Sequence, residues 1–356
     1  MLDRIREKVS SGKRLGFEEG LYLFENDDIF STGRLASLIA ERKNGKKVYY
    51  VRNRHINPTN ICMNRCRFCA FSRSRGDIDA FELTIEEIID KLRGDDYREV
   101  HIVGGLHPEW DFDYYVRMVS EIKRAFPDIH IKAFTAVEID HFAKISNLSI
   151  RDVLLRLKDS GLDALPGGGA EIFSERVRKR LCPEKIDADR WLEIHRTAHL
   201  LGIRTNATML YGHIEDYMDR VDHLLRLRRL QDETGGFMAF IPLSYHPLNT
   251  ETGGSYSSGI DDLKTIAVSR LILDNFDHIK AYWIMLGEKI AQVSFLFGAD
   301  DIDGTVIEEK ITHSAGGTTS EGITVDEIED IIMRAGRIPV ERDALYNIIG
   351  GFVVKG

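Results

Sequence analysis

The 356-residue chain lacks several features that would place it in a membrane or on nucleic acid. No apolar run approaches the ~20 residues that a membrane-spanning helix needs. The first residues, Met1–Arg14, contain no apolar stretch typical of a signal peptide. Basic residues are in deficit, with 48 Lys and Arg against 57 Asp and Glu, whereas nucleic-acid binding needs a basic surplus. We therefore expect a cytoplasmic protein with no membrane or nucleic-acid partner.

Phosphate-binding glycine motifs and disulfide-forming cysteines are also scarce. Neither G-x-G-x-x-G nor G-x4-G-K-[ST] occurs, which argues against the binding of dinucleotides or nucleoside triphosphates. The chain has four cysteines, and without a secretion signal we do not expect them to form disulfide bonds. Three of them, Cys62, Cys66 and Cys69, lie close together, while Cys182 stands apart. This cluster of cysteines is the most informative feature of the sequence.

Strand-like and helix-like patterns alternate along most of the chain. Strands are expected at 48–56, 100–103, 130–135, 162–165, 204–210, 238–245 and 278–285, with a weaker eighth at 294–297. Helical patterns fill the gaps, and Thr84 with Glu87 forms a capping box before one of them. This alternation predicts an α/β fold closed as a (β/α)8 TIM-type barrel, with an open doubly wound sheet as the alternative.

No linker or low-complexity tract divides the chain, so we expect one barrel with appended ends. The expected parts are a helical extension (1–47), the barrel (48–300) and a C-terminal segment that caps the barrel (301–356). In both candidate folds, ligands bind at the carboxyl ends of the parallel strands. The loops from strand to helix are therefore where functional residues are expected.

The three clustered cysteines follow the first expected strand with the spacing C-x3-C-x2-C, which is typical of a metal site. A structural zinc ion would need a fourth ligand, either Cys182 or a histidine. A four-iron cluster held by three thiolates leaves one iron open to a substrate or cofactor. We favour the iron–sulfur cluster and keep the zinc site as the alternative.

This motif, with an aromatic residue before its last cysteine, resembles that of the radical S-adenosylmethionine (SAM) superfamily. The resemblance implies that Cys62, Cys66 and Cys69 hold a [4Fe-4S] cluster whose open iron binds SAM. It also implies that one electron from the cluster splits SAM into methionine and a 5′-deoxyadenosyl radical. The residues that the resemblance places around SAM are Phe68, Gly104, Gly105, Glu138, Glu171, Gly212 and Glu215.

Longer stretches narrow the resemblance. The segments 135–144, 191–199, 206–213 and 240–247 are similar to radical SAM enzymes of the futalosine branch of menaquinone biosynthesis, above all to aminofutalosine synthases. This implies radical addition to 3-[(1-carboxyvinyl)oxy]benzoate with loss of carbon dioxide, giving 6-amino-6-deoxyfutalosine and consuming SAM. The implied partners are this small-molecule substrate, an enolpyruvyl benzoate, and a one-electron reductant such as a flavodoxin or ferredoxin.

Three alternatives remain beside this interpretation. The enzyme alternatives are cyclic dehypoxanthine futalosine synthase and a deazaflavin (FO) synthase-type radical SAM enzyme. Both would release free 5′-deoxyadenosine instead of an adenosyl adduct. The non-enzyme alternative is an iron–sulfur electron-transfer protein, in which Cys182 would be the fourth cluster ligand.

Four residues outside the SAM set are candidates for contact with the substrate: Asn206, Tyr211, His246 and Arg75. The direction of the first two depends on strand register, and His246 is expected at the carboxyl end of the sixth strand. Arg75 belongs to a group of four arginines beside the cysteines. These arginines could contact a carboxylate or a reductant, or they could simply lie on a solvent-exposed loop without such a role. The other members are Arg65, Arg67 and Arg73.

Two further groups are expected to have packing roles. His195 and His199 lie four residues apart, as in a zincin helix, but Arg196 stands where that motif has Glu. Cys182 precedes Pro183 at the end of a helix and is expected to be a small buried residue.

Overall fold

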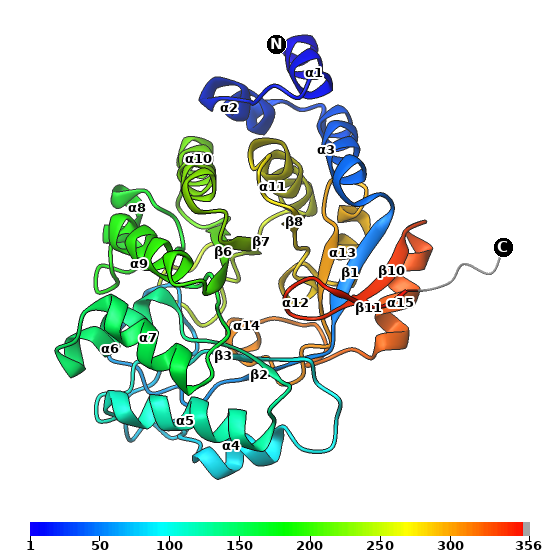
Figure 1. The fold of residues 1–356 in the computed structure, drawn as a ribbon. Helices are drawn as coiled ribbons and strands as arrows, with labels where there is room; N and C mark the ends of the chain where they lie inside the picture. Colours follow the sequence, from blue (N-terminus) through cyan, green and yellow to red (C-terminus); the bar gives the residue numbers. More distant parts are fainter. Residues whose placement is uncertain (352–356) are drawn as a thin grey trace.

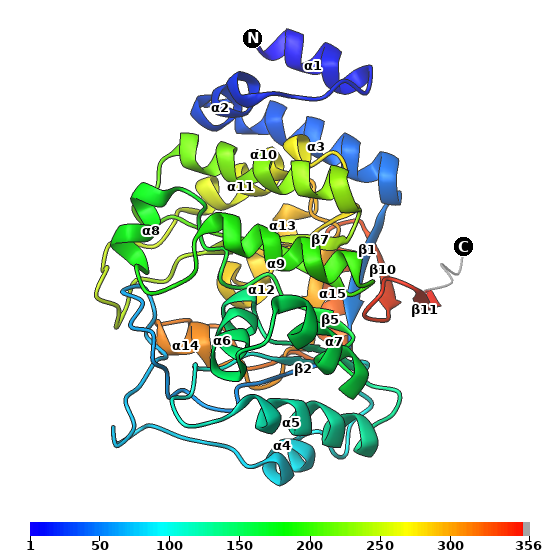
Figure 2. The ribbon, with the colours of Figure 1, turned by 60° about the vertical axis from the view of Figure 1, so that its left-hand side comes forward.

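The computed structural model describes residues 1–351, in which a curled parallel sheet is covered by helices (Figure 1, Figure 2). The strand order is β2-β3-β4-β5-β6-β7-β8. These strands are β2 (Asn53–Ile56), β3 (Glu99–Ile102), β4 (His130–Ala133), β5 (Ala164–Leu165), β6 (Arg204–Tyr211), β7 (Phe237–Ser244) and β8 (His278–Ile279). The fold is therefore the predicted TIM-type α/β architecture, and the doubly wound alternative is wrong.

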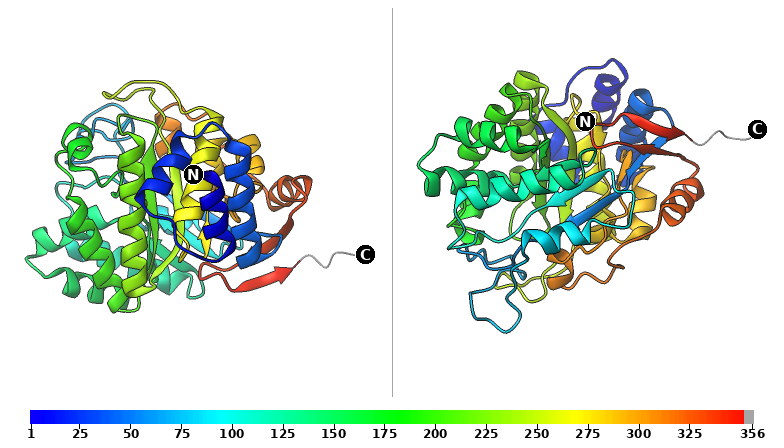
Figure 3. Two further views of the ribbon diagram at one scale, coloured as in Figure 1. Left: turned by 90° about the horizontal axis from the view of Figure 1, so that it is seen from above. Right: turned by 60° about the horizontal axis from the view of Figure 1, so that its bottom comes forward.

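The helices between the strands lie outside the curled sheet (Figure 3). They are α4 (Ile85–Lys91), α5 (Phe112–Ala125), α6 (Ala136–Ser146), α7 (Ile150–Ser160), α8 (Glu175–Leu181), α9 (Ala188–Leu200), α10 (Tyr217–Thr234) and α11 (Gly259–Ile272). Thr84 and Glu87 form the predicted capping box of α4, and Thr135 and Glu138 form another at the start of α6. Such caps fix where each loop turns into a helix, and thereby shape the carboxyl-end loops.

The two faces of the sheet differ in polarity. On β3, Val100 and Ile102 are fully buried in the hydrophobic core. The alternate residues Glu99 and His101 are polar, and His101 lines a cavity inside the barrel together with Lys132 of β4. Because side chains alternate across a strand, the apolar set packs against the helices and the polar set faces the barrel interior.

A second sheet, in the order β11-β10-β1-β9, lies beside the first. Its strands are β1 (Lys47–Val51), β9 (Asp301–Gly304), β10 (Ile338–Arg342) and β11 (Ile348–Gly351). Asp301 of β9 bridges Lys280 beside β8, and Ile307 bridges Arg54 of β2. The segment 301–307 thus links the last strand of the seven-stranded sheet to the first, although the sequence analysis assigned it to the C-terminal segment.

Three predicted strands need correction. The eighth strand predicted at 294–297 is wrong, because α13 (Glu288–Ser294) ends there and a turn follows. The strand that follows is β9, whose sequence Asp-Ile-Asp-Gly is polar. It can be buried because Asp301 pairs with Arg342 and Asp303 pairs with Lys280. It therefore carries little of the apolar signal that identifies a strand.

The other two corrections concern segments that change conformation along their length. The predicted strand 48–56 is divided into β1 and β2. The predicted strand 278–285 is extended only at β8, and then turns into α12 (Trp283–Leu286). Apolar composition alone does not mark either change of direction.

Helices from the two ends of the chain pack around this frame. The N-terminal helices are α1 (Leu2–Ser10), α2 (Phe17–Glu25) and α3 (Ile29–Asn44), drawn at the top of Figure 1. Helix α2 packs against α10 and α11, and α3 packs against α11. After β9 come α14 (Ile311–Ser314) and α15 (Val325–Arg334), while the last residues of the predicted C-terminal segment, 352–356, lie outside the described residues. Among residues 1–351, no helix has both the length and the apolar character needed to cross a membrane.

Candidate active site

A cavity of about 310 Å³ lies inside the barrel. Its wall is built largely from residues that directly follow the strands, as expected for ligand binding in this fold. The three clustered cysteines contribute one side of this wall. Further wall residues include Asn57, Gly104, Gly105, Thr135, Glu138, Glu171, Lys185, Asn206, Tyr245 and His246.

The cysteine loop is held in place by backbone hydrogen bonds. The Cys62 N–H donates to the Arg73 carbonyl at 3.1 Å, and the Cys69 N–H donates to the Cys66 carbonyl at 3.0 Å. The Leu106 N–H points at Cys62 Sγ, 3.4 Å away. All three cysteines are free thiols, and burial raises the pKa of Cys62 and raises that of Cys66 to about 12. The positive charge of a bound metal would favour the thiolate form of Cys62 and Cys66.

The arrangement of the cysteines suits an iron–sulfur cluster better than a zinc ion. A structural zinc ion would need a fourth ligand beside the three cysteines. In a four-iron cluster, by contrast, each thiolate binds a different iron. Cys182 is 1% exposed and is not among the residues that line the cavity. The three cavity thiols thus fit a cluster with one open iron.

Gly104 and Gly105 are needed where the end of β3 meets the cysteine loop. The Gly105 N–H donates to the Thr59 carbonyl at 2.9 Å. A Cβ on Gly105 would clash with the backbone carbonyl of Ile61, whereas one on Gly104 would lie 3.1 Å from the Thr59 carbonyl oxygen. The glycine pair therefore lets the backbone that carries Cys62 approach the sheet closely.

Glu138 has a structural and an electrostatic role at the cavity wall. Its carboxylate accepts hydrogen bonds from the Thr135 N–H at 2.7 Å and from the Thr135 hydroxyl at 2.9 Å. Burial raises the pKa of Glu138 to about 7, although hydrogen bonds from Thr135 and from the Gly104 backbone favour its charged form. A cationic group bound beside it would draw this carboxyl fully into the ionised state.

Lys185 is a cavity residue that the sequence analysis missed. It pairs with Glu171, and its ammonium lies 4.9 Å from the centre of the Phe68 ring. Burial opposes the charge on Lys185, but the Glu171 carboxylate raises its pKa above the ordinary value. Glu171 itself has a φ of 44°, a left-handed conformation that non-glycine residues rarely adopt. Strain of this kind is frequent at functional sites.

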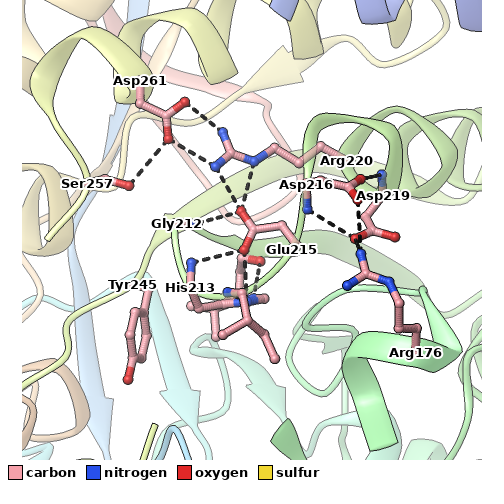
Figure 4. A network of polar contacts seen from close by, with 12 residues as sticks. Arg176, Gly212, His213, Glu215, Asp216, Asp219, Arg220, Tyr245, Ser257 and Asp261 are labelled. Atoms are coloured by element: carbon pink, nitrogen blue, oxygen red, sulfur yellow. Dashed lines mark hydrogen bonds and ion pairs between the residues drawn. The ribbon is translucent and has the colours of Figure 1, made fainter. Parts of the chain in front are cut away.

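Gly212 and Glu215, in contrast, belong to a closed polar network behind the cavity wall (Figure 4). The Glu215 carboxylate accepts from the Gly212 N–H at 2.6 Å and the His213 N–H at 2.9 Å, and pairs with Arg220 at 2.8 Å. Arg220 in turn pairs with Asp261 at 2.8 Å. Burial opposes ionisation of Glu215, but His213 and Arg220 hold its pKa well below the usual range. Neither Gly212 nor Glu215 lines the cavity.

The four substrate candidates divide into two pairs. Asn206 and His246 line the cavity, and each has an atom without a hydrogen-bond partner: Oδ1 of Asn206 and Nδ1 of His246. The Tyr211 hydroxyl instead donates to Asp262 at 2.7 Å, and the side chain is fully buried away from the cavity. Arg75 is exposed and pairs with Glu109. The structure therefore brings only the first two candidates to the cavity.

Further polar residues at the cavity come from β2 and β3. His55 and His101 are paired across the two strands, with Nε2 and Nδ1 3.4 Å apart. Asn57 donates through Nδ2 to the Val103 carbonyl at 2.8 Å, which leaves its Oδ1 without a partner. The sequence analysis missed all three. The signal was the alternation of polar residues with apolar ones within buried strands.

His195 and His199 have the packing role that the sequence analysis expects. Both rings lie within hydrogen-bond distance of the Thr205 hydroxyl, at 2.9 Å and 2.8 Å. His199 also reaches the Thr234 hydroxyl at 2.7 Å. These contacts join α9 to the start of β6.

Comparisons with known proteins identify the family of the chain. The family model of the radical SAM superfamily matches residues 56–227, and the model of the CofH/MqnC C-terminal region matches residues 234–350. The chain is 52% identical to aminodeoxyfutalosine synthase of Thermus thermophilus, over 96% of this chain and 94% of the relative. It is 47% identical to 5-amino-6-(D-ribitylamino)uracil–L-tyrosine 4-hydroxyphenyl transferase of Methanopyrus kandleri, over 85% of this chain and 84% of the relative.

A solved structure shows the same fold at low sequence identity. Methylornithine synthase superposes with a TM-score of 0.76 at 18% identity, covering 94% of this chain and 97% of the other. Fold, cysteine loop and relatives together define an enzyme that uses a [4Fe-4S] cluster and SAM. The chain belongs to the radical SAM superfamily, and within it to the transferases that resemble aminodeoxyfutalosine synthase. The predicted superfamily and cofactors are confirmed, and the electron-transfer protein is excluded.

Proposed function

We propose that the chain forms 6-amino-6-deoxyfutalosine for menaquinone biosynthesis from SAM and 3-[(1-carboxyvinyl)oxy]benzoate, with release of carbon dioxide. The observation that carries this proposal is the 52% identity to aminodeoxyfutalosine synthase over nearly the whole chain. When bound, the cluster would supply the electron that cleaves SAM into methionine and an adenosyl radical, and this electron would be returned when carbon dioxide is lost, so that the overall reaction conserves electrons. The protein supplies binding, orientation and exclusion of water.

The proposed roles of the cavity residues follow from their positions. Cys62, Cys66 and Cys69 hold the cluster. The Glu138 carboxylate offers an acceptor for the amino group of SAM, and Gly104, whose backbone donates to that carboxylate, lies beside it at the wall. The remaining proposed SAM residues at the wall are Phe68, Gly105 and Glu171. We assign Gly212 and Glu215 an indirect role: they shape the turn after β6 that faces the adenosine.

The middle of the cavity wall is apolar. Val103, Val137, Ile241, Leu243 and Met285 contribute to it. An apolar wall excludes water from a reactive radical and confines the substrate alkene close to the radical carbon. Asn206 and His246 lie on the same wall and offer polar contacts for the substrate.

The second candidate function is 4-hydroxyphenyl transfer from tyrosine to 5-amino-6-(D-ribitylamino)uracil, the activity named for the Methanopyrus relative. The charges of the cavity favour it. Among the described lining residues, the two lysines are already paired, Lys132 with Glu99 and Lys185 with Glu171. Buried unpartnered atoms on the wall include Oδ1 of Asn57, Oδ1 of Asn206, Nδ1 of His246 and Nε2 of His101, and the first three are hydrogen-bond acceptors. Acceptors suit the amino and hydroxyl groups of these substrates, which carry one carboxylate, on tyrosine, against the two of the benzoate.

Mass spectrometry of anaerobic reactions tests both functions. The reconstituted enzyme is given SAM and dithionite, with either 3-[(1-carboxyvinyl)oxy]benzoate or tyrosine plus 5-amino-6-(D-ribitylamino)uracil. We expect an adenosyl adduct of the benzoate that lacks one carbon dioxide. A 4-hydroxyphenyl adduct of the uracil would establish the second function instead. Free 5′-deoxyadenosine without an adduct in either reaction would contradict both.

A further inference from the structure

Three exposed arginines surround the outer side of the cysteine loop. Arg65 and Arg67 flank Cys66 in the sequence and are both exposed. Arg67 donates through Nη1 to the Arg180 carbonyl at 3.0 Å, and its N–H donates to the Leu181 carbonyl at 2.8 Å. These contacts place the end of α8, with the exposed Arg180, beside the cysteine loop (Figure 2).

These arginines are not used to stabilise the fold by ion pairs. No carboxylate oxygen of residues 1–351 lies within 4.0 Å of the guanidinium groups of Arg65, Arg67 and Arg180. The other two arginines of the loop are paired: Arg73 with Asp79 at 2.7 Å, and Arg75 with Glu109. The first three therefore form a local basic surface on a chain whose net charge is −9.

An exposed apolar residue belongs to the same loop. The side chain of Met63 is 57% exposed, although its N–H is fixed to the Leu106 carbonyl at 2.9 Å. Arg and Met are both enriched in protein interfaces relative to the remaining protein surface. We use the name basic face for Met63, Arg65, Arg67 and Arg180.

The chemistry of the site demands an external electron donor near this loop. The cluster must be reduced by one electron before it can cleave SAM, although the overall reaction conserves electrons, and the rate of electron transfer falls steeply with distance. The cavity side of the cysteines faces the substrate, so a protein donor must approach from the outer side. Cys66 is only 8% exposed, but its two neighbours in the chain are exposed.

We propose that the basic face is the docking surface of an acidic one-electron carrier protein. Charge complementarity selects this partner, because three unpaired arginines attract an acidic surface and repel a basic one. The exposed carboxylates on adjacent segments, Glu184 and Glu251, lie beyond ion-pair distance of these arginines and define the edge of the surface. Complexes of this kind are small and short-lived, so docking should be weak and strongly dependent on salt. The proposal rests on the cluster and is independent of which substrate the enzyme uses.

The experiment compares two double variants with the same change in net charge. Arg65→Glu with Arg67→Glu reverses the basic face. Arg34→Glu with Arg229→Glu is the control, because both are exposed arginines without a carboxylate within 4.0 Å, on helices α3 and α10 away from the cysteine loop. The holoenzyme is mixed with reduced flavodoxin, an acidic carrier, at low and high ionic strength. The readouts are the dissociation constant and the rate at which flavodoxin reduces the cluster, followed by EPR spectroscopy.

We expect reversal of the basic face to weaken flavodoxin binding and slow cluster reduction by about tenfold or more at low salt, with a smaller difference at high salt. Cluster reduction by dithionite and SAM-dependent product formation with dithionite should remain unchanged, because a small reductant needs no docking surface. Equal effects of the two double variants on flavodoxin binding would overturn the proposal. Failure of the proposed function would instead appear in the dithionite reaction.

A second variant covers the case in which the loop substitutions disturb the cluster. Arg180→Glu changes the basic face from α8, outside the cysteine loop. We expect it to weaken flavodoxin binding by a few-fold while the iron content stays at the wild-type value. If Arg180→Glu has full iron content and wild-type flavodoxin affinity, the basic face is not the docking surface.

Discussion

The cavity wall and the network around Glu215 both contain buried polar atoms, and the resemblance to radical SAM enzymes assigns residues of both to SAM. The two regions differ in how these polar atoms are satisfied. The Glu215 carboxylate has partners on both oxygens, and its side chain has no exposure to solvent. The cavity wall, by contrast, contains unpartnered atoms on Asn57, Asn206 and His246. A buried polar atom without a partner is costly, so it is tolerated mainly where a ligand or water completes it.

This difference separates residues that hold the fold from residues that hold ligands. Substitutions in the Glu215 network should lower stability more than ligand affinity. Substitutions of the unpartnered atoms should do the opposite. Substitutions of Cys62, Cys66 or Cys69 should abolish function outright, because these three thiolates are the proposed ligands of the cluster.

The largest effect is expected for the cluster ligands. Cys66→Ala should abolish cluster binding and all SAM cleavage, because two thiolates cannot hold a four-iron cluster stably. Cys182→Ala is the matched control and should retain the iron content of the wild type, since Cys182 lies outside the cavity. Iron and sulfide analysis after anaerobic reconstitution measures both. Loss of the cluster in Cys182→Ala would contradict the three-cysteine site.

The next largest effect is expected where the sheet meets the cysteine loop. Gly105→Ala places a Cβ against the Ile61 backbone, so the loop must move, at a cost of about 1–3 kcal/mol of stability and much of the bound iron. Gly104→Ala, with a Cβ at 3.1 Å from the nearest oxygen, should cost less of both. Thermal unfolding and iron analysis test this order. Wild-type iron content in Gly105→Ala would show that the loop tolerates the shift.

A third prediction concerns Glu215. Glu215→Gln removes a buried charge and leaves Arg220 with Asp261 alone, which should destabilise the protein by about 3 kcal/mol. Glu193→Gln removes an exposed carboxylate that pairs with Arg190 and should change stability by about 0.5 kcal/mol or less. Chemical denaturation measures both. If Glu215→Gln keeps wild-type stability but loses SAM affinity, the network is a ligand site.

The same carboxylate predicts a pH dependence. The native pKa of Glu215 lies below the unfolded value of 4.5, so the unfolded state binds the proton more readily. The stabilisation is therefore fully present above pH 4.5 and is lost as the pH falls below it. Denaturation of the wild type at pH 7.5 and pH 4 should show a larger loss than denaturation of Glu215→Gln at the same two values. Equal losses would mean that folding does not lower the pKa of Glu215.

The smallest effect is expected for Asn206. Asn206→Ala should weaken substrate binding by up to about tenfold, the value of one neutral hydrogen bond, with little change in Tm. Asn275→Ala is the contrasting variant, because Asn275 donates to the Arg228 carbonyl and to Asp232 outside the cavity. It should lower Tm and leave the KM for substrate unchanged. A lower Tm with unchanged KM in Asn206→Ala would assign that residue to the fold.

On strand β6, the alternation of side chains decides which candidate residues face the cavity. Asn206, Thr208 and Leu210 of β6 all line the cavity. Since side chains alternate along a strand, Tyr211 must then point to the opposite face. Asn206 and Tyr211 were both candidates, yet on one regular strand they cannot both face inward. The odd spacing of the two residues in the sequence is sufficient to show that only one of them can contact a ligand in the barrel.

Two features of the structure, the position of Lys185 and strand β9, could not be predicted from sequence patterns. Lys185 contacts Glu171 and Phe68, which lie on two separate loops. Strand β9 is polar because its carboxylates pair with Lys280 and Arg342. Neither feature leaves a local periodicity, so neither could be recognised from neighbouring residues.

The amino-acid sequence was sufficient for the superfamily and for the alternation of strands and helices, and it predicts the cluster ligands, because each depends on spacing within a few residues. The three cysteines need only one short loop to face one cluster. The tertiary structure alone decided which polar side chains are free to bind ligands. That depends on partners such as Asp261 for Arg220 and Glu171 for Lys185, which only folding brings together.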